Sequence, residues 1–249
     1  MDKYLKEVEQ ALLKTVIKDP EYTDFRSKCT NHKVLGHRLP LMHGLDRKGF
    51  SFYKLSKEEI LKTWTHIWNT SQYHESMYLP LFYYRRHLKD LDEQTWKSLK
   101  TWIDRVENWE HADALCALYS VMLERFPKLV EPTLRKWNRA KNPWEKRASV
   151  VSTIYYASKN RKAPSLKLVL ELVEPLIGHK DPYVQKGVGW QLREAYKLHP
   201  KQVLAFLKKY NTRLPATVFS YATEKLPATE KKKLKDERKL SRTKKILNR

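Results

Sequence analysis

Two short stretches that share one pattern decide the fold class: residues 142–148 read NPWEKRA and residues 181–187 read DPYVQKG, 39 positions further along the chain. Each begins with an Asx-Pro pair, which suits the start of a helix because the Asx side chain caps the first turn and proline fits the first helical position. A second pair of segments, 126–137 and 199–210, matches at an offset of 73. This offset is close to twice the first, and it indicates an internal repeat.

Aromatic residues continue this repeat towards the N-terminus at intervals of 35–39 residues. They stand at the expected starts of four helices, at Tyr73, Trp109, Trp144 and Tyr183. Elsewhere the apolar residues keep the three-and-four spacing of amphipathic helices, and no segment combines β-branched alternation with an Asn-Gly turn. Further helix starts are expected after Ser56 and Asp92.

The repeat length predicts the architecture. A unit of this size holds two helices and cannot bury its apolar face alone, so neighbouring units stack into a curved solenoid with one concave face. We therefore predict an all-α chain, folded as a HEAT-like helical repeat solenoid with a basic concave face. The helices that begin at the recurrent aromatic residues are expected to line that face, and an ordinary helical bundle is the alternative.

The charge of the chain indicates a polyanionic partner. The 249 residues carry 50 Lys+Arg and 28 Asp+Glu, a formal net charge of +22. Residues 230–249 hold +7 of this, which leaves +15 on residues 1–229. We predict a single domain over 1–229, followed by a basic tail over 230–249 that is either disordered or helical. A compact domain this basic usually meets DNA, RNA or an anionic membrane face.

Composition and spacing exclude several other classes of protein. The first residues are charged and lack the apolar core of a secretory signal, and no apolar run approaches the roughly 20 residues of a membrane span. Cys29 and Cys116 lie far apart without a CxxC motif, which excludes a disulfide framework and a cysteine-based zinc site. We expect a cytoplasmic, nucleoid-associated monomer that needs no metal, no cofactor, no membrane and no obligate protein partner.

The helix expected from Pro182 has two distinct faces. One stripe carries aromatic and basic side chains: Tyr183, Lys186, Trp190 and Arg193. The opposite stripe is apolar and should face the core: Val184, Val188, Leu192 and Ala195. Gly187 and Gly189 lie in the same helix, where each costs about 1 kcal/mol relative to alanine. Close approach by another backbone, or tight helix packing, would account for them.

A carboxylate follows one of the recurrent tryptophans. Trp109 and Asp113 are four residues apart and share one helical face. Phosphates repel a carboxylate in a cationic cleft, so Asp113 is a poor ligand for DNA, but it would stabilise positive charge that develops on a sugar. Cleavage of an N-glycosidic bond produces such an oxocarbenium-like state, and tryptophan faces also favour a cation. The alternative is that Trp109 and Trp190 belong to the core and that Asp113 pairs with an arginine.

At these residues the chain resembles the AlkD-type alkylpurine DNA glycosylases, bacterial HEAT-like repeat proteins that excise cationic N3- and N7-alkylated purines. The similarity runs over most of residues 34–226 and is strongest in 108–147 and in 185–194. The resemblance implies that Trp109 and Trp190 contact the deoxyribose and that Asp113 is the catalytic carboxylate. It also implies that the base is not drawn into a protein pocket, unlike the usual mode of enzymes that act on bases.

The basic residues of the same blocks are the predicted DNA contacts. The resemblance assigns Arg147 and Arg193 to phosphates, and we add their neighbours on the expected concave face together with Arg38 from the N-terminal part. The complete predicted set comprises Arg147, Arg193, Lys186, Lys146, Trp144 and Arg38.

The N-terminal part departs from the family pattern. Residues 36–40 read GHRLP, where Arg38 replaces the glutamine of the family. On a short early helix Ser27 stands where the family has an aromatic residue, and Phe25 would substitute only with a shift. Residues 46–53 look like an insertion. These changes leave Trp109, Asp113 and Trp190 intact and bear on substrate range.

The sequence therefore predicts a monofunctional DNA glycosylase that hydrolyses the N-glycosidic bond of alkylated cationic purines in duplex DNA. No lysine is clearly placed as a Schiff-base nucleophile, so lyase activity is not expected. A non-catalytic DNA-binding or lesion-sensing protein is the first alternative. A HEAT scaffold for an acidic partner, or an RNA binder, is the second.

Overall fold

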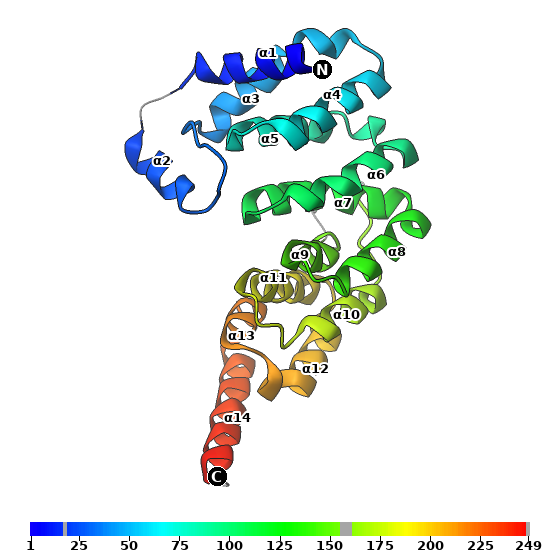
Figure 1. Cartoon of the computed structure of the whole chain (residues 1–249). Coiled ribbons are helices and arrows are strands. Elements are labelled where there is room, and N and C mark those ends of the chain that lie inside the picture. Colours follow the sequence, from blue (N-terminus) through cyan, green and yellow to red (C-terminus); the bar gives the residue numbers. More distant parts are fainter. Residues whose placement is uncertain (17–18, 155–160, 248–249) are drawn as a thin grey trace. The chain divides into compact units, whose positions relative to one another are not determined.

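The computed structural model describes residues 1–16, 19–154 and 161–247, and within these ranges it is built from helices (Figure 1). Fourteen α-helices and five short 3₁₀-helices (η) are assigned in the described part of the chain. An isolated bridge between Lys33 and Tyr73 is the β-type pairing found there. The all-α prediction is confirmed.

The chain divides into two compact units, residues 1–122 and 123–249, each with its own internal contacts. The elements of the first unit are α1 (Asp2–Leu13), α2 (Pro20–Ser27), α3 (Leu39–Lys48), η1 (Ser51–Lys54), α4 (Lys57–Thr70), α5 (His74–Arg86), η2 (Leu88–Asp90), α6 (Glu93–Leu99), η3 (Lys100–Arg105) and α7 (Trp109–Arg125), whose last turn passes the boundary. The elements of the second are α8 (Pro127–Asn138), α9 (Pro143–Val151), α10 (Leu166–Val173), η4 (Glu174–Leu176), α11 (Pro182–Leu198), α12 (Pro200–Tyr210), η5 (Asn211–Arg213), α13 (Ala216–Ala222) and α14 (Ala228–Leu247).

Local sequence signals set many of these helix starts. The Ser56 hydroxyl and the Glu59 carboxylate form a reciprocal capping box at the start of α4. The side chains of Asp92, Asn142 and Asp181 each accept a hydrogen bond from a backbone N–H of the first turn of α6, α9 and α11. The four starts expected from the sequence are confirmed.

The recurrent aromatic residues mark one series of helices. Tyr73 is the N-cap of α5, Trp109 is the first residue of α7, and Trp144 and Tyr183 are the second residues of α9 and α11. Within the second unit α9 packs against both α8 and α11, and α11 also packs against α13. The helical repeat read from the sequence is therefore present in the structure.

The first unit is held by an aromatic core. The indole rings of Trp68 and Trp102 stack at 5.0 Å, and Trp68 Nε1 donates to the Trp102 carbonyl oxygen at 2.9 Å. The insertion-like stretch 46–53 adds to this core, since Phe52 is fully buried with its ring 4.9 Å from that of Trp64. Asp46 is also fully buried and forms an ion pair with Arg86 at 2.6 Å. The stretch is thus part of the packing between α3, α4 and α5.

The second unit is held by aliphatic side chains. The stripe of α11 that was expected to face the core does so, with Val184, Val188 and Leu192 fully buried. Gly189 allows α13 to come close, because a Cβ at this position would lie 2.6 Å from Tyr221 Cβ and 3.1 Å from the Val218 carbonyl oxygen. A Cβ at Gly187 would instead meet the side chain of Arg147, at 3.2 Å. Tight packing therefore explains both glycines.

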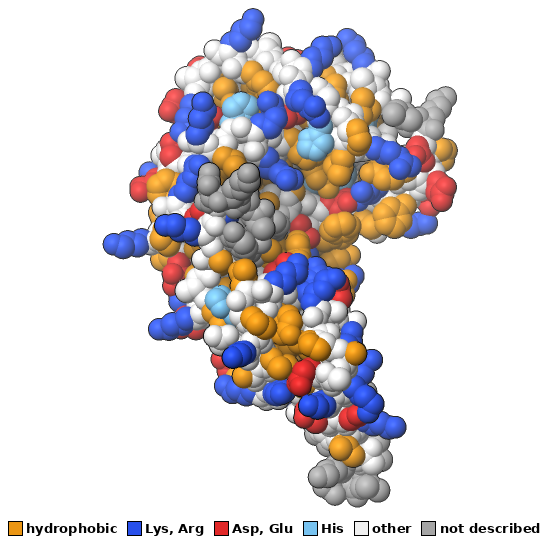
Figure 2. Space-filling model, turned by 180° about the vertical axis from the view of Figure 1, so that it is seen from behind, with side chains coloured by type: hydrophobic (Ala, Val, Ile, Leu, Met, Phe, Trp, Pro, Cys, Tyr) orange, Lys and Arg blue, Asp and Glu red, His pale blue; other side chains and the backbone are white. Residues whose placement is uncertain are grey.

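The basic tail is helical over its described residues, 230–247. It belongs to α14, which begins at Ala228, so the domain boundary predicted after residue 229 lies inside this helix. Leu234 is buried, and Asn211 Nδ2 donates to the Leu234 carbonyl oxygen at 2.9 Å and to Glu237 at 2.8 Å. Figure 2 shows Lys and Arg side chains beside acidic ones along this helix at the foot of the view. The single-domain assignment of residues 1–229 stays a prediction.

Candidate functional site

In the first unit, the start of α7 presents two of the predicted site residues. Trp109, its first residue, is 40% exposed, and Asp113, one turn later, is half-buried. Along the same helix, Ala112, Leu115 and Cys116 are fully buried. Trp109 is therefore not a core residue. The structure presents an exposed indole and a partly exposed carboxylate one helical turn apart.

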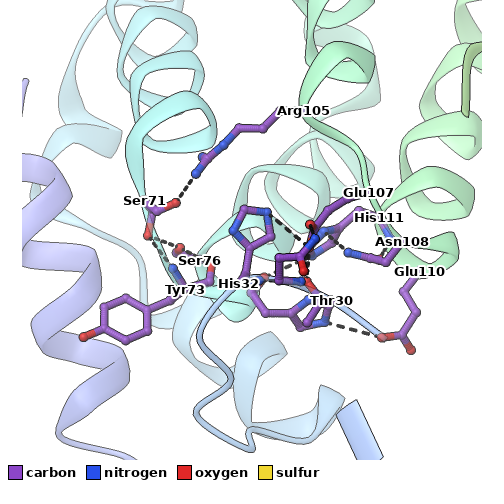
Figure 3. Close-up of polar contacts among 12 residues, drawn as sticks. Thr30, His32, Ser71, Tyr73, Ser76, Arg105, Glu107, Asn108, Glu110 and His111 are labelled. Carbon is purple, nitrogen blue, oxygen red and sulfur yellow. Dashed lines mark hydrogen bonds and ion pairs between the residues drawn. The ribbon is translucent and has the colours of Figure 1, made fainter. Parts of the chain in front are cut away.

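A buried cap fixes the first turn of α7. Asn108 Oδ1 accepts from the His111 backbone N–H at 2.9 Å, and its Nδ2 donates to His111 Nδ1 at 2.9 Å (Figure 3). With Nδ1 accepting, His111 Nε2 carries the proton and donates to the His74 carbonyl oxygen at 3.0 Å. The cap thus ties the start of α7 to the start of α5 through groups shielded from water.

The histidines of this region are neutral. Burial lowers the pKa of His74 to about 4, and the positive charge of Arg26 adds to the effect. Burial also holds the pKa of His111 well below its ordinary value. Neutral imidazoles need no counter-charge, so the carboxylates of this region are left to pair with arginine and with hydrogen-bond donors.

The segment after α2 docks on the residue that precedes the cap. Glu107 accepts from the Thr30 hydroxyl and from the Asn31 backbone and side-chain N–H groups, the last two at 2.7 Å (Figure 3). Burial opposes ionisation of this carboxyl group, but these hydrogen bonds lower its pKa. Arg105 donates to the carbonyl oxygens of Trp68 and Ser71. The segment that precedes α7 is therefore held at Glu107 by the residues after α2 and at Arg105 by the end of α4.

The short helix α2 adjoins the same part of α7. Arg26 forms an ion pair with Glu110, the second residue of α7, and Glu110 also lies 3.4 Å from His74 Nε2. Phe25 projects outward and is 57% exposed, while the Ser27 hydroxyl donates to the Thr23 carbonyl oxygen. The aromatic side chain that α2 offers to solvent is thus that of Phe25, not one at position 27.

Arg38 joins α2 to α3. It is the N-cap residue of α3, and its guanidinium pairs with Asp19 at 2.6 Å and lies 4.8 Å from the Tyr22 ring. The hydrogen bond from Arg38 lowers the pKa of Asp19. The Arg38 side chain is 63% exposed, so a DNA contact by this residue stays a prediction.

In the second unit, α11 displays the expected stripe of aromatic and basic side chains. Trp190 and Arg193 are half-buried, and Lys186 is exposed, with its Nζ 5.4 Å from the Tyr183 ring. Arg193 pairs with Glu194 at 3.2 Å and with Glu224 at 2.5 Å. The charge of Arg193 is therefore partly compensated, whereas no ion pair is recorded for Lys186 in the described part of the chain.

Arg147 lies deeper than the sequence suggested. It is 4% exposed, and its Nη1 donates to the Tyr183 carbonyl oxygen at 2.5 Å. Trp144, on the same helix, packs its ring 5.0 Å from that of Tyr183. Lys146 is half-buried, and its charge adds to burial in lowering the pKa of His179. The contact of Arg147 with phosphate stays a prediction, and a role in joining α9 to α11 is visible in the structure.

Each unit brings together its own part of the predicted site. The first holds Arg38, Trp109 and Asp113, and the second holds Trp144, Lys146, Arg147, Lys186, Trp190 and Arg193. Sequence reasoning missed the pair of Arg26 and Glu110, because no local spacing signals a contact between such distant positions.

No group of three or more His, Cys, Asp or Glu side chains is arranged to hold a metal ion in the part of the chain that the structure describes. Within the same ranges, no helix combines the length and the apolarity that crossing a bilayer demands.

Comparisons with known proteins fit this fold. A model of the family described as DNA alkylation repair enzyme matches residues 10–226. No curated protein matches the sequence significantly. Among solved structures, a predicted DNA alkylation repair enzyme from Enterococcus faecalis is similar with a TM-score of 0.71 and 15% identity, over 86% of this chain and 96% of that one.

Two structures from Streptococcus mutans are also similar. AlkD2 has a TM-score of 0.56 and 17% identity, over 84% of this chain and 99% of that one. The protein smu.31 of strain UA159 has the same TM-score and identity, over 88% of this chain and 100% of that one. These likenesses show a shared fold, and the family match confirms the resemblance read from the sequence.

Proposed function

Because the family model covers most of its length, the chain belongs to the family of DNA alkylation repair enzymes, and we propose that it hydrolyses the N-glycosidic bond of alkylated, positively charged purines in duplex DNA. The observation that carries this proposal is the start of α7. There an exposed indole, that of Trp109, lies one helical turn from the Asp113 carboxylate.

The substrate chemistry explains why so few groups suffice. Alkylation at N3 or N7 gives the purine a positive charge, which weakens the bond between C1′ and N9. When that bond breaks, its electron pair goes to the purine, which leaves as a neutral base. No general acid is needed to protonate the leaving group. The positive charge then resides on the deoxyribose as an oxocarbenium-like species.

Asp113 and the tryptophans are proposed to stabilise the positive charge on the deoxyribose. A fixed carboxylate stabilises a developing cation most effectively where little water intervenes. The face of an indole ring adds a weaker attraction for the same cation. Water then attacks C1′ and releases a proton, for which Asp113 is a suitable acceptor. Trp109 supplies one indole, and Trp190 of the second unit is proposed to supply another.

The basic side chains are proposed to hold the DNA backbone. Lys186 is exposed, forms no ion pair within the described part of the chain and lies on the same stripe of α11 as Trp190. The other proposed contacts are Lys146, Arg147, Arg193, Arg38 and Trp144. Phosphate contacts of this kind position the duplex without reading its sequence, which suits an enzyme that must act on a lesion in any context.

The deciding experiment is release of the damaged base. Duplex DNA with a single N7-methylguanine is incubated with excess protein, and free base is separated from DNA over time. Matched undamaged duplex and heat-denatured protein are the controls. Release above the spontaneous rate supports the proposal. Tight binding to damaged duplex without release would favour a lesion-sensing protein instead, and absence of both would overturn the DNA assignment.

A further inference from the structure

A buried ion pair joins the short helix α2 to the start of α7. The side chains of Arg26 and Glu110 are only 17% and 6% exposed. The second carboxylate oxygen of Glu110 faces His74 Nε2 at 3.4 Å, so the pair also reaches α5. Three elements of the first unit therefore meet at one carboxylate, which Figure 3 shows among the polar groups at the start of α7.

The place of Glu110 in the chain links this pair to the candidate site. Glu110 directly follows Trp109 and lies three residues before Asp113. A rotation or shift of the first turn of α7 would therefore move the indole and the carboxylate together. The Asn108 cap fixes this turn through His111, whereas the ion pair of Arg26 with Glu110 connects the turn to α2.

Helix α2 depends on polar tethers. It has only eight residues and none of them is buried, so no apolar core holds it in place. Its start is bound through Asp19 to Arg38, and the segment after it is bound to Glu107. Arg26 is the tether between these two points, with its guanidinium 5.0 Å from the Tyr22 ring.

The charges of Arg26 and Asp113 reach the same buried group. Burial raises the pKa of the Tyr78 phenol, the charge of Arg26 opposes this shift, and the charge of Asp113 reinforces it. Arg26 therefore lies near the part of the first unit that surrounds Asp113. It compensates the negative charge of Glu110, which would otherwise stand one turn from the proposed catalytic carboxylate.

We propose that Arg26 is a positioning residue: by pairing with buried Glu110 it fixes α2 on the first turn of α7 and so orients Trp109 and Asp113 towards the sugar. This inference rests on the proposed glycosylase function for its kinetic consequence. The structural part, that Arg26 orders α2 and the first turn of α7, stands independently.

The test compares two ion pairs of the first unit, each of which has a buried carboxylate. Arg26→Met removes the proposed tether, and Arg86→Met breaks the pair with fully buried Asp46 between α5 and α3. Single-turnover base release is measured over a range of protein concentrations, which separates the maximal rate from the half-saturating concentration. Amide hydrogen exchange is followed on peptides that cover 20–27 and 109–113.

We expect Arg26→Met to lower the maximal rate by about 10- to 100-fold, the scale of a small misplacement of reacting groups. The half-saturating concentration should change little, because the Arg26 side chain is largely buried and its charge is paired with Glu110. Exchange should accelerate in both peptides. Arg86→Met should lower the melting temperature while leaving the maximal rate per folded molecule and the exchange of these peptides unchanged.

Two further variants guard against simple misfolding. Arg26→Lys retains the charge but not the planar guanidinium that lies beside the Tyr22 ring, so it should recover part of the rate that Arg26→Met loses. The double variant Arg26→Met/Glu110→Gln should lose less than the single one, since no buried carboxylate is left without its partner. Equal exchange and an unchanged maximal rate in Arg26→Met would overturn the proposal. If the wild-type protein releases no base, the glycosylase function fails, and the exchange data still decide whether Arg26 orders this turn.

Discussion

Arg147 Nη1 donates a hydrogen bond to the backbone carbonyl oxygen of Tyr183 at 2.5 Å, so a side chain of α9 is bound to the first turn of α11. The remainder of the Arg147 side chain fills the space beside Gly187, where a Cβ would lie 3.2 Å from its Cγ. With 4% of its surface exposed, this arginine is part of the contact between two helices of the second unit.

We therefore expect Arg147→Ala to act first on stability. Loss of the donor leaves the Tyr183 carbonyl without this partner, which costs about 1–3 kcal/mol of unfolding free energy. Urea titrations of the variant and the wild type measure this difference. If stability is unchanged while the salt dependence of duplex binding falls by one full phosphate contact, a slope of about 0.9, Arg147 acts at the surface instead.

Gly189 provides a test of the packing between α11 and α13. Alanine there would place a Cβ 2.6 Å from Tyr221 Cβ and 3.1 Å from a backbone oxygen of α13, and backbone cannot yield as a flexible side chain can. Gly189→Ala should therefore destabilise the protein by roughly 1–3 kcal/mol, as overpacking does. Thermal melts compare it with Gly44→Ala in α3, where nothing lies within 4 Å of the new methyl group. The control should gain about 0.5–1 kcal/mol from better helix propensity, and an equal response of both sites would contradict the packing argument.

The buried histidines predict an acid-sensitive first unit. Folding lowers the pKa of His74 to about 4 and holds that of His111 well below its ordinary 6.5, so the unfolded chain binds more protons below pH 6.5. Stability is therefore complete above pH 6.5 and falls as the pH drops below it, by roughly 3 kcal/mol at pH 4 from His74 alone. Urea unfolding at pH 7, 6 and 5 should show this decline before most carboxylates titrate, and His74→Gln should reduce it. A flat profile between pH 7 and 5 would contradict the neutral cluster.

The sequence predicted those features of this molecule that depend on residues close to one another in the chain, and it missed those that depend on contacts between distant residues. The Asx-Pro caps and the recurrent aromatic residues act within one helical turn, and the helix starts at Asn142 and Asp181 are where they indicate. The sequence also predicted which face of a helix a residue occupies, since Trp109 is exposed and Val188 is buried. The depth of Arg147 was not, because it depends on α11 packing against α9. The partner of Arg26 was equally out of reach, because periodicity within one helix carries no information about a residue on another.

The two halves of α14 should differ in what they contribute. Ending the chain after Thr229 removes Leu234, which is 1% exposed, and the groups that Asn211 binds, so we expect a loss of about 2 kcal/mol or more. Ending it after Leu240 keeps these anchors and removes four basic residues, at positions 242, 244, 245 and 249. The longer chain should melt like the wild type but bind undamaged duplex with a weaker salt dependence. Equal stability of both truncations would show that α14 does not pack on the body of the second unit.

Asp113→Asn separates the proposed chemistry from binding and from folding. The substitution preserves the size of the side chain and most of its hydrogen bonding, but it removes the negative charge from the first turns of α7. If that charge stabilises an oxocarbenium-like sugar, single-turnover base release should fall by about 10²-fold or more. Duplex affinity should stay equal or increase, because a group that repels phosphate is gone. Trp109→Ala and Trp190→Ala should also slow release, through loss of sugar contact and of cation–π attraction.

A structural role for Asp113 predicts the reverse pattern, a lower melting temperature with full activity per folded molecule. Release, affinity and thermal stability measured on this one variant therefore distinguish the two roles, and undiminished release would refute the mechanism even for a protein that binds damaged DNA.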